Sequence, residues 1–290
     1  MNYIPRYAEF LKSHVDATRH MRVVFDFSNG PTAVILPSVL RGIRQITPVY
    51  LDRQQSGNFP GHGPNPMVKK AQVHLSQSVL KNKADMGVIF DADGDRAFFA
   101  DSHGRILDSH MIAYLLFLFR KPPYVLDEIT YTLLRKAGLL FGQAHLCRVG
   151  SIFIKKMMKA SGATTGAEYS GHFYFKEFFY VDSGIMTAIQ VMNAVSRLPY
   201  TLADFYDFFP KSYSTLHAVE TSKPNLHIED VVKRCRAGGW GINRLDGALC
   251  DGGETWIHAR ASNTEPLVRV FGSGTSREKV TAMMKSLKLI

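Results

Sequence analysis

The chain has 290 residues, 46% of them hydrophobic, which predicts packed cores in two or three domains and excludes a wholly disordered chain. Its 35 Lys and Arg against 25 Asp and Glu give a formal net charge of +10, which suits an anionic partner. The basic residues are scattered, and the sequence shows no helix-turn-helix, aromatic RNA-binding platform or zinc finger. We therefore expect no nucleic-acid partner and favour a phosphorylated metabolite.

Membrane association and disulfides are not predicted either. No segment reaches the roughly 18 apolar residues that a membrane-spanning helix needs, and no apolar segment of the signal-peptide kind follows the N-terminal residues. The three cysteines, Cys147, Cys235 and Cys250, are far apart and lack metal-ligand spacing. Reduced thiols in a cytoplasmic protein are the simplest interpretation.

Strand-like and helix-like patterns alternate through the first two thirds of the chain, which indicates parallel α/β layers. In the first part the pattern predicts strands at 22–27, 46–51, 86–90 and 97–100, and helices at 32–44 and 67–80. In the second part it predicts strands at 124–126, 145–149 and 164–168, and helices starting near 109 and spanning 130–137, 151–160 and 183–195. Ser151 is a possible N-cap of its helix.

The pattern changes after residue 210. Short strands are predicted at 216–220, 256–260 and 267–271, with helices at 228–236 and 277–287. The predicted fold is therefore two similar three-layer α/β/α domains with mixed sheets, followed by an α+β domain with an antiparallel sheet. We place the three domains at residues 1–107, 108–210 and 211–290.

Residues 91–96 read Asp-Ala-Asp-Gly-Asp-Arg and lie between two predicted strands. Three carboxylates at alternate positions repel one another unless a cation lies among them, so the pattern predicts a hard divalent ion. A solvated acidic turn is the alternative. An EF-hand calcium loop is excluded, because that loop needs Gly and Glu where this chain has Arg96 and Ser102.

Two further segments extend this motif into a family pattern. Residues 167–172 read Ala-Glu-Tyr-Ser-Gly-His, and residues 260–266 read Arg-Ala-Ser-Asn-Thr-Glu-Pro. In this order and spacing the three motifs resemble those of the α-D-phosphohexomutases, the phosphomannomutase/phosphoglucomutase family. Gly57-Asn58-Phe59-Pro60, and Gly150 leading into Ile154-Lys155-Lys156, are weaker echoes of the same family.

The resemblance implies a role for each motif. Asp91, Asp93 and Asp95 would bind Mg²⁺, and Arg96 would orient a phosphate or balance the acidic charges. Glu168, Ser170 and His172 would contact sugar hydroxyls. A phosphate clamp would come from the last motif, where arginine offers a planar fork and its neighbours offer hydroxyl and amide donors. The clamp residues would be Arg260, Ser262, Asn263 and Thr264.

The family's catalytic phosphoserine lies in a first domain, and no matching serine loop is present in this sequence. The resemblance therefore implies domains two to four of a phosphohexomutase, with no catalytic residue of its own. Such a chain would act on mannose and glucose 1- and 6-phosphates, or a hexose bisphosphate, when a separate serine domain is supplied. A catalytically silent phosphosugar-binding remnant is the alternative. Departures from the family pattern at Ala92, Ala167 and Ser151 slightly favour it.

Overall fold

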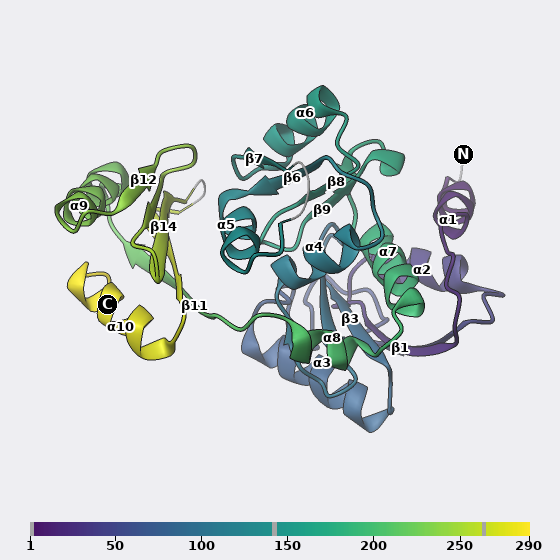
Figure 1. The fold of residues 1–290 in the computed structure, drawn as a ribbon. Helices are drawn as coiled ribbons and strands as arrows, with labels where there is room; N and C mark the ends of the chain where they lie inside the picture. Colours follow the sequence, from purple (N-terminus) through teal and green to yellow (C-terminus); the bar gives the residue numbers. More distant parts are fainter. Residues whose placement is uncertain (1–2, 141–143, 263–264) are drawn as a thin grey trace. The chain divides into compact units, whose positions relative to one another are not determined.

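The computed structural model describes residues 3–140, 144–262 and 265–290, which form two compact units (Figure 1). Unit 1 takes in residues 1–145 and 150–209, and unit 2 takes in residues 146–149 and 210–290. The fold class predicted from the sequence is confirmed, with two mixed sheets and one antiparallel sheet. The division of the chain into three domains stays a prediction.

The first sheet of unit 1 is a five-stranded mixed sheet whose middle strands are buried. Strand β1 pairs in parallel with β2 and β3, and β3, β4 and β5 continue the sheet in antiparallel fashion. Helix α3 covers one face, while α1 and α2 pack on the other. The elements are α1 (Ile4–Lys12), β1 (Met21–Asp26), α2 (Thr32–Leu40), β2 (Ile46–Leu51), α3 (Lys69–Lys81), β3 (Met86–Phe90), β4 (Ala97–Asp101) and β5 (Ile106–Leu107).

The second sheet of unit 1 has the strand order β10-β9-β8-β6-β7, with β6 and β8 parallel and β8, β9 and β10 antiparallel. Its elements are α4 (Ser109–Phe117), β6 (Tyr124–Asp127), α5 (Glu128–Lys136), β7 (Ala144–Cys147), α6 (Ser151–Ser161), β8 (Thr165–Ala167), β9 (Phe173–Phe175), β10 (Val181–Asp182), α7 (Gly184–Arg197) and α8 (Leu202–Phe208). Helix α7 is buried along nearly all of its length because it packs against strands of both sheets. The N-terminus of α7 is therefore held inside unit 1.

Unit 2 is an antiparallel sheet with the order β11-β15-β14-β13-β12. Its elements are β11 (Tyr213–Glu220), α9 (Pro224–Ala237), β12 (Gly241–Asn243), β13 (Ala248–Asp251), β14 (Thr255–Ala261), β15 (Leu267–Gly274) and α10 (Arg277–Ser286). Apolar residues of α9 and α10 share one core with alternate residues of the strands, such as Ile257, Ala259 and Val270. The intervening strand residues therefore lie on the face that these two helices leave uncovered.

Several predicted boundaries differ from the structure by a few residues, and two of the differences have a clear local cause. Helix α2 ends at Leu40, four residues early, because Arg41 is extended (ψ 118°) and Gly42 has a φ of +81°. Ser151 is the first helical residue of α6 rather than its N-cap, which is Gly150 with a φ of +125°. A left-handed φ of that kind is easy only for glycine, so this turn depends on Gly150.

All three cysteines are buried, and no disulfide joins them. Among the described residues no helix is long and apolar enough to cross a membrane. The cellular compartment stays a prediction.

Candidate functional site

The acidic loop 91–96 begins directly after β3 and ends where β4 starts. One oxygen from each of Asp91, Asp93 and Asp95 can be chosen so that all three lie within 4.8 Å of one another. Asp91 is buried, whereas Asp93 is exposed. The loop therefore brings together the three carboxylates that the sequence singled out, in a strand–turn–strand setting that has no EF-hand helices.

The three carboxylates of this loop repel one another, which shows in the pKa values of two of them. Burial raises the pKa of Asp95 to about 6, and the nearby His172 opposes that rise, while Asp91 and Asp93 add to it. Burial and the charge of Asp91 also raise the pKa of Asp93. Oδ1 of Asp95 is buried and accepts no hydrogen bond from the described residues. This set of hard oxygen donors fits Mg²⁺, which binds proteins through a few carboxylates and keeps several waters.

Arg96 closes the loop onto its first carboxylate. Its Nε donates to Oδ2 of Asp91 at 2.5 Å, while Oδ1 of Asp91 accepts from the backbone N–H groups of Gly94 and Arg96 at 3.1 and 3.2 Å. Asp91 therefore shapes the turn through one oxygen and pairs with the arginine through the other.

The N-terminus of α7 packs directly against this loop. The backbone N–H of Gly184 donates to the carbonyl of Gly94 at 2.9 Å. A Cβ at position 184 would lie 2.6 Å from the carbonyl oxygen of Arg96 and 2.8 Å from that of Gly94. Ser183 caps the helix by accepting from Met186 N. Gly184 has no side chain, and this allows helix α7 and the acidic loop to approach so closely.

The turn 168–172 lies beside the acidic loop. Arg96 and His172 form an antiparallel bridge, and Ala97 N donates to the carbonyl of Gly171 at 3.4 Å. His172 Nδ1 lies 3.0 Å from Oδ2 of Asp182 and 3.8 Å from Oδ1 of Asp95. The turn therefore places an imidazole next to the candidate metal ligands.

Asp182 links this histidine to a lysine. Lys155 Nζ, from α6, lies 3.4 Å from Oδ1 of Asp182. Burial opposes protonation of His172, but the hydrogen bond to Asp182 and the nearby carboxylates raise its pKa overall. Burial likewise opposes ionisation of Asp182, yet the hydrogen bond from His172 and the charge of Lys155 lower its pKa. Asp182 therefore lies between a histidine and a lysine that both favour its ionised form.

Glu168 is engaged by the protein itself. It is only 2% exposed, and its Oε1 accepts from Gly150 N at 2.6 Å while its Oε2 accepts from the Tyr174 hydroxyl at 2.8 Å. In this arrangement Glu168 fixes the Gly150 turn at the start of α6. Ser170, by contrast, is half-buried in the turn. The assignment of either residue as a sugar contact stays a prediction.

In unit 2, Arg260 lies on the sheet face that α9 and α10 leave uncovered. It stands directly opposite Arg269 in the β14–β15 register, so two cationic side chains share a cross-strand position. Like charges placed directly opposite are unfavourable unless an anion compensates them. Arg260 Nε lies 3.9 Å from Oδ2 of Asp246, and Arg148 Nε lies 4.0 Å from its Oδ1. Arg269 Nη2 in turn donates to Oε2 of Glu265 at 3.4 Å. Each of the two opposed guanidinium groups thus lies near one protein carboxylate and has further N–H donors for an anion.

The loop that follows Arg260 is only partly described. Ser262 N donates to the carbonyl of Leu267 at 2.9 Å, which closes the hairpin between β14 and β15. Asn263 and Thr264 were also predicted to belong to the phosphate clamp, and both lie outside the described residues.

Several residues near these groups were not chosen as site residues from the sequence. Lys155 was noticed only as part of a family-like segment, and Asp182, Arg148 and Arg269 were not chosen as site residues. Their sequence signal is weak, because a lone charged residue in a strand, helix or loop has no motif of its own. Their positions follow from strand order and register, which bring together residues far apart in the chain.

Comparison with known proteins identifies the family. The family model "Phosphoglucomutase/phosphomannomutase, alpha/beta/alpha domain II" matches residues 2–104, and the corresponding domain III model matches residues 128–213. A phosphomannomutase/phosphoglucomutase of Pseudomonas syringae pv. tomato is 30% identical over 293 residues, which cover 96% of this chain and 62% of the relative. The chain belongs to the α-D-phosphohexomutase family. It spans about 62% of the length of this curated relative.

Solved structures show the same fold. A phosphoglucomutase/phosphomannomutase family protein from Burkholderia thailandensis has a TM-score of 0.85 at 23% identity, over 99% of this chain and 63% of that one. An Aspergillus fumigatus N-acetylphosphoglucosamine mutase in complex with GlcNAc-6P and magnesium has a TM-score of 0.66 at 13% identity, over 99% of this chain and 68% of that one.

Proposed function

We propose that this chain is the metal- and sugar-phosphate-binding part of a phosphohexomutase-type phosphotransferase acting on mannose or glucose 1- and 6-phosphates. The observation that carries the proposal is the meeting of three carboxylates in the 91–96 loop, beside His172 and Asp182, in a chain of this family. The related Aspergillus enzyme was solved with a sugar phosphate and magnesium, which supports the same ligand classes here.

Mg²⁺ would be held by Asp91, Asp93 and Asp95, where it would neutralise charge on phosphate oxygens. The protein's own side chains would position the substrate and stabilise its charge. His172, whose Nδ1 is held by Asp182, has its other ring nitrogen for a hydrogen bond with a sugar hydroxyl or a phosphate oxygen. Ser170 adds a hydroxyl beside it.

Unit 2 supplies the phosphate-binding groups. Arg260 and Arg269, opposite one another on the uncovered sheet face, have the planar forks that bind phosphate oxygens in pairs. The proposal assigns Ser262, Asn263 and Thr264 as hydroxyl and amide donors of the same clamp.

Phosphoryl transfer also needs a phosphorylated nucleophile, which the family carries on a serine. The chain offers no such serine loop, so the proposal assigns that step to a domain outside the 290 residues. A phosphosugar-binding module without turnover is the second candidate. It is favoured by the buried carboxylate of Glu168, both of whose oxygens are already used within the protein.

The test is isothermal titration calorimetry of the full chain with glucose 1-phosphate and mannose 1-phosphate, with and without Mg²⁺. We expect binding that weakens at least tenfold in Arg260→Ala, while Arg236→Ala, at an exposed arginine of α9, binds like the parent. If neither glucose 1-phosphate nor mannose 1-phosphate binds, both candidate functions are contradicted.

Turnover separates the two candidates. A serine domain from a related mutase, added in trans, should allow conversion between the 1- and 6-phosphates if the enzyme proposal holds. Binding without conversion in the presence of a phosphorylated serine domain would favour the binding module.

A further inference from the structure

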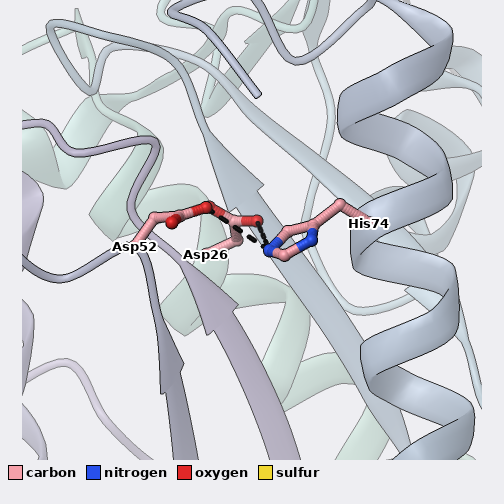
Figure 2. Close-up of side chains that lie close together, drawn as sticks. All are labelled: Asp26, Asp52 and His74. Carbon is pink, nitrogen blue, oxygen red and sulfur yellow. Dashed lines mark ion pairs between the residues drawn. The ribbon is translucent and has the colours of Figure 1, made fainter. Parts of the chain in front are cut away.

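A second cluster of metal-binding side chains lies at the edge of the first sheet, apart from the 91–96 loop. Asp26 is the last residue of β1, Asp52 follows β2 directly, and His74 lies in α3. Figure 2 shows the three side chains converging, with the His74 ring reaching from the helix toward both carboxylates. Because β1 and β2 are parallel, with Asp26 in register with Leu51, both carboxylates emerge at the same sheet edge.

The distances within this cluster match a metal site. His74 Nε2 lies 3.4 Å from Oδ2 of Asp52 and 3.7 Å from Oδ2 of Asp26, and the three ligand atoms lie within 4.8 Å of one another. Zinc bonds of about 2.0–2.2 Å place the ligands of a tetrahedral site roughly 3.3–3.6 Å apart. The cluster is therefore already near the spacing that one ion would require.

The carboxylate of Asp26 is oriented as a metal ligand would be. It is fully buried, and its Oδ1 accepts from Ser28 N and contacts His62 Nε2, both at 3.0 Å. Its Oδ2, which faces His74, accepts no hydrogen bond from the described residues. Ligating carboxylates are commonly held in this way, with one oxygen hydrogen-bonded by the protein and the other on the metal.

Asp52 provides a second carboxylate oxygen that faces the cluster without a hydrogen-bond donor. Its Oδ2 is buried and also lacks a hydrogen bond among the described residues, although His62 Nε2 lies 3.5 Å away. Gly61 packs against this carboxylate so closely that a Cβ there would lie 2.6 Å from Oδ2. Two buried carboxylate oxygens without hydrogen-bond donors are costly to leave unpaired, and a divalent cation would satisfy both.

We propose that Asp26, Asp52 and His74 form a binding site for a first-row transition-metal ion of the zinc type, with His62 supporting Asp26. Nitrogen and oxygen donors together favour such an ion over Mg²⁺, which prefers oxygen alone. His74 is 43% exposed at its side chain, so the fourth position opens to solvent and is available to water. The site is distinct from the carboxylates of loop 91–96.

The metal would fasten the ends of β1 and β2 to α3. The segment between Asp52 and α3 contacts the acidic loop, because Ala92 N donates to the carbonyl of Pro64 at 3.1 Å. Binding at Asp52 would therefore stabilise a segment on which the 91–96 loop rests.

The test uses the full chain freed of metal by a chelator and then supplied with excess Mg²⁺. Titration with Co²⁺ should give visible absorption of a low-coordinate site that saturates at one equivalent and is displaced by one equivalent of Zn²⁺. Zn²⁺ should also raise the unfolding temperature, because it binds the folded state alone. Absence of this absorption in the parent chain would overturn the proposal.

Substitutions at the proposed ligands test whether the ion binds at this cluster. His74→Ala and Asp52→Asn should each abolish the one-equivalent absorption and the thermal shift. Both should fold, because His74 is partly exposed and asparagine tolerates the positive φ of 45° at position 52. His20→Ala, at an exposed histidine just before β1, should behave like the parent.

Asp93→Asn keeps this test separate from the proposed function. It alters loop 91–96 alone and should retain the full Co²⁺ absorption. Loss of the absorption in Asp93→Asn, or its retention in His74→Ala, would place the ion elsewhere and overturn the proposal.

Discussion

Arg96 donates its Nε to Oδ2 of Asp91 at 2.5 Å, so a cationic side chain of the acidic loop occupies an oxygen that the loop would also offer to a metal. The same arginine lies 3.8 Å from Oδ1 of Asp95. The guanidinium therefore compensates part of the charge that Mg²⁺ would compensate on binding.

Replacing Arg96 with alanine should tighten Mg²⁺ binding, because it frees Oδ2 of Asp91 and removes a nearby positive charge. The expected gain is on the order of 1 kcal/mol, or severalfold in Kd, as measured by isothermal titration calorimetry. Arg41→Ala, at an exposed arginine after α2, should bind Mg²⁺ as the parent does. Weaker binding in Arg96→Ala would show that the arginine is needed to orient Asp91.

The close approach of α7 to the acidic loop gives a second prediction. Gly184→Ala should destabilise the protein by about 1–3 kcal/mol, because the added Cβ meets the carbonyl oxygens of Gly94 and Arg96 at less than 3 Å. It should also weaken Mg²⁺ binding, since the loop must shift. Urea unfolding and Mg²⁺ titration measure the two effects.

Gly57→Ala is the matched control for this substitution. A Cβ at position 57 meets nothing within 4 Å, so the stability should stay within about 0.5 kcal/mol of the parent. Parent-like stability in Gly184→Ala would mean that helix and loop separate without cost.

Glu168 gives a third prediction, which concerns stability. Glu168→Ala should cost about 3 kcal/mol in urea unfolding, because it leaves the half-buried N–H of Gly150 and the buried hydroxyl of Tyr174 without their acceptor. Glu168→Gln should cost about 1 kcal/mol, since the Tyr174 hydroxyl can rotate and accept from the new amide. Glu9→Ala, at an exposed glutamate of α1, should change little. Equal costs for the two replacements at position 168 would contradict this account.

Local patterns in the sequence predicted much of unit 1. The strands at 46–51 and 86–90 were predicted with the observed bounds, because each is a short apolar run of β-prone residues between turns. Helices α1 and α8 and the short strands β5, β9, β10, β12 and β13 were missed. Strands of two to four residues are too short for alternation to show, and they exist because neighbouring strands pair with them.

The residues of the candidate sites also fall into those that a local pattern predicts and those that only the fold brings together. Asp91, Asp93 and Asp95 were recognisable because one tight turn places them together, so spacing in sequence is spacing in space. Asp182 comes to His172 through the pairing of β10 with β9, and Asp26 meets Asp52 and His74 through parallel strand order and a helix. No local pattern encodes such meetings, which depend on register and on the packing of α3.

His110 gives a prediction for the dependence of stability on pH. It is buried in the first turn of α4 between the rings of Tyr169 and Phe209, and burial lowers its pKa to about 4. Between about pH 6.5 and 4 the unfolded chain takes up a proton at this residue that the folded protein does not. Stability should therefore fall as the pH falls through that range, by about 3 kcal/mol in full at about 1.4 kcal/mol per pKa unit.

His110→Phe should remove this contribution while keeping a ring of similar shape among its aromatic neighbours. Between pH 7.5 and 5 the variant should lose about 2 kcal/mol less stability than the parent in urea unfolding. Burial raises the pKa of Asp127 to about 6, which acts in the opposite direction in the same range but is common to both proteins and cancels in the comparison. Parallel pH profiles for parent and variant would show that His110 is protonated in the folded state as readily as in the unfolded chain.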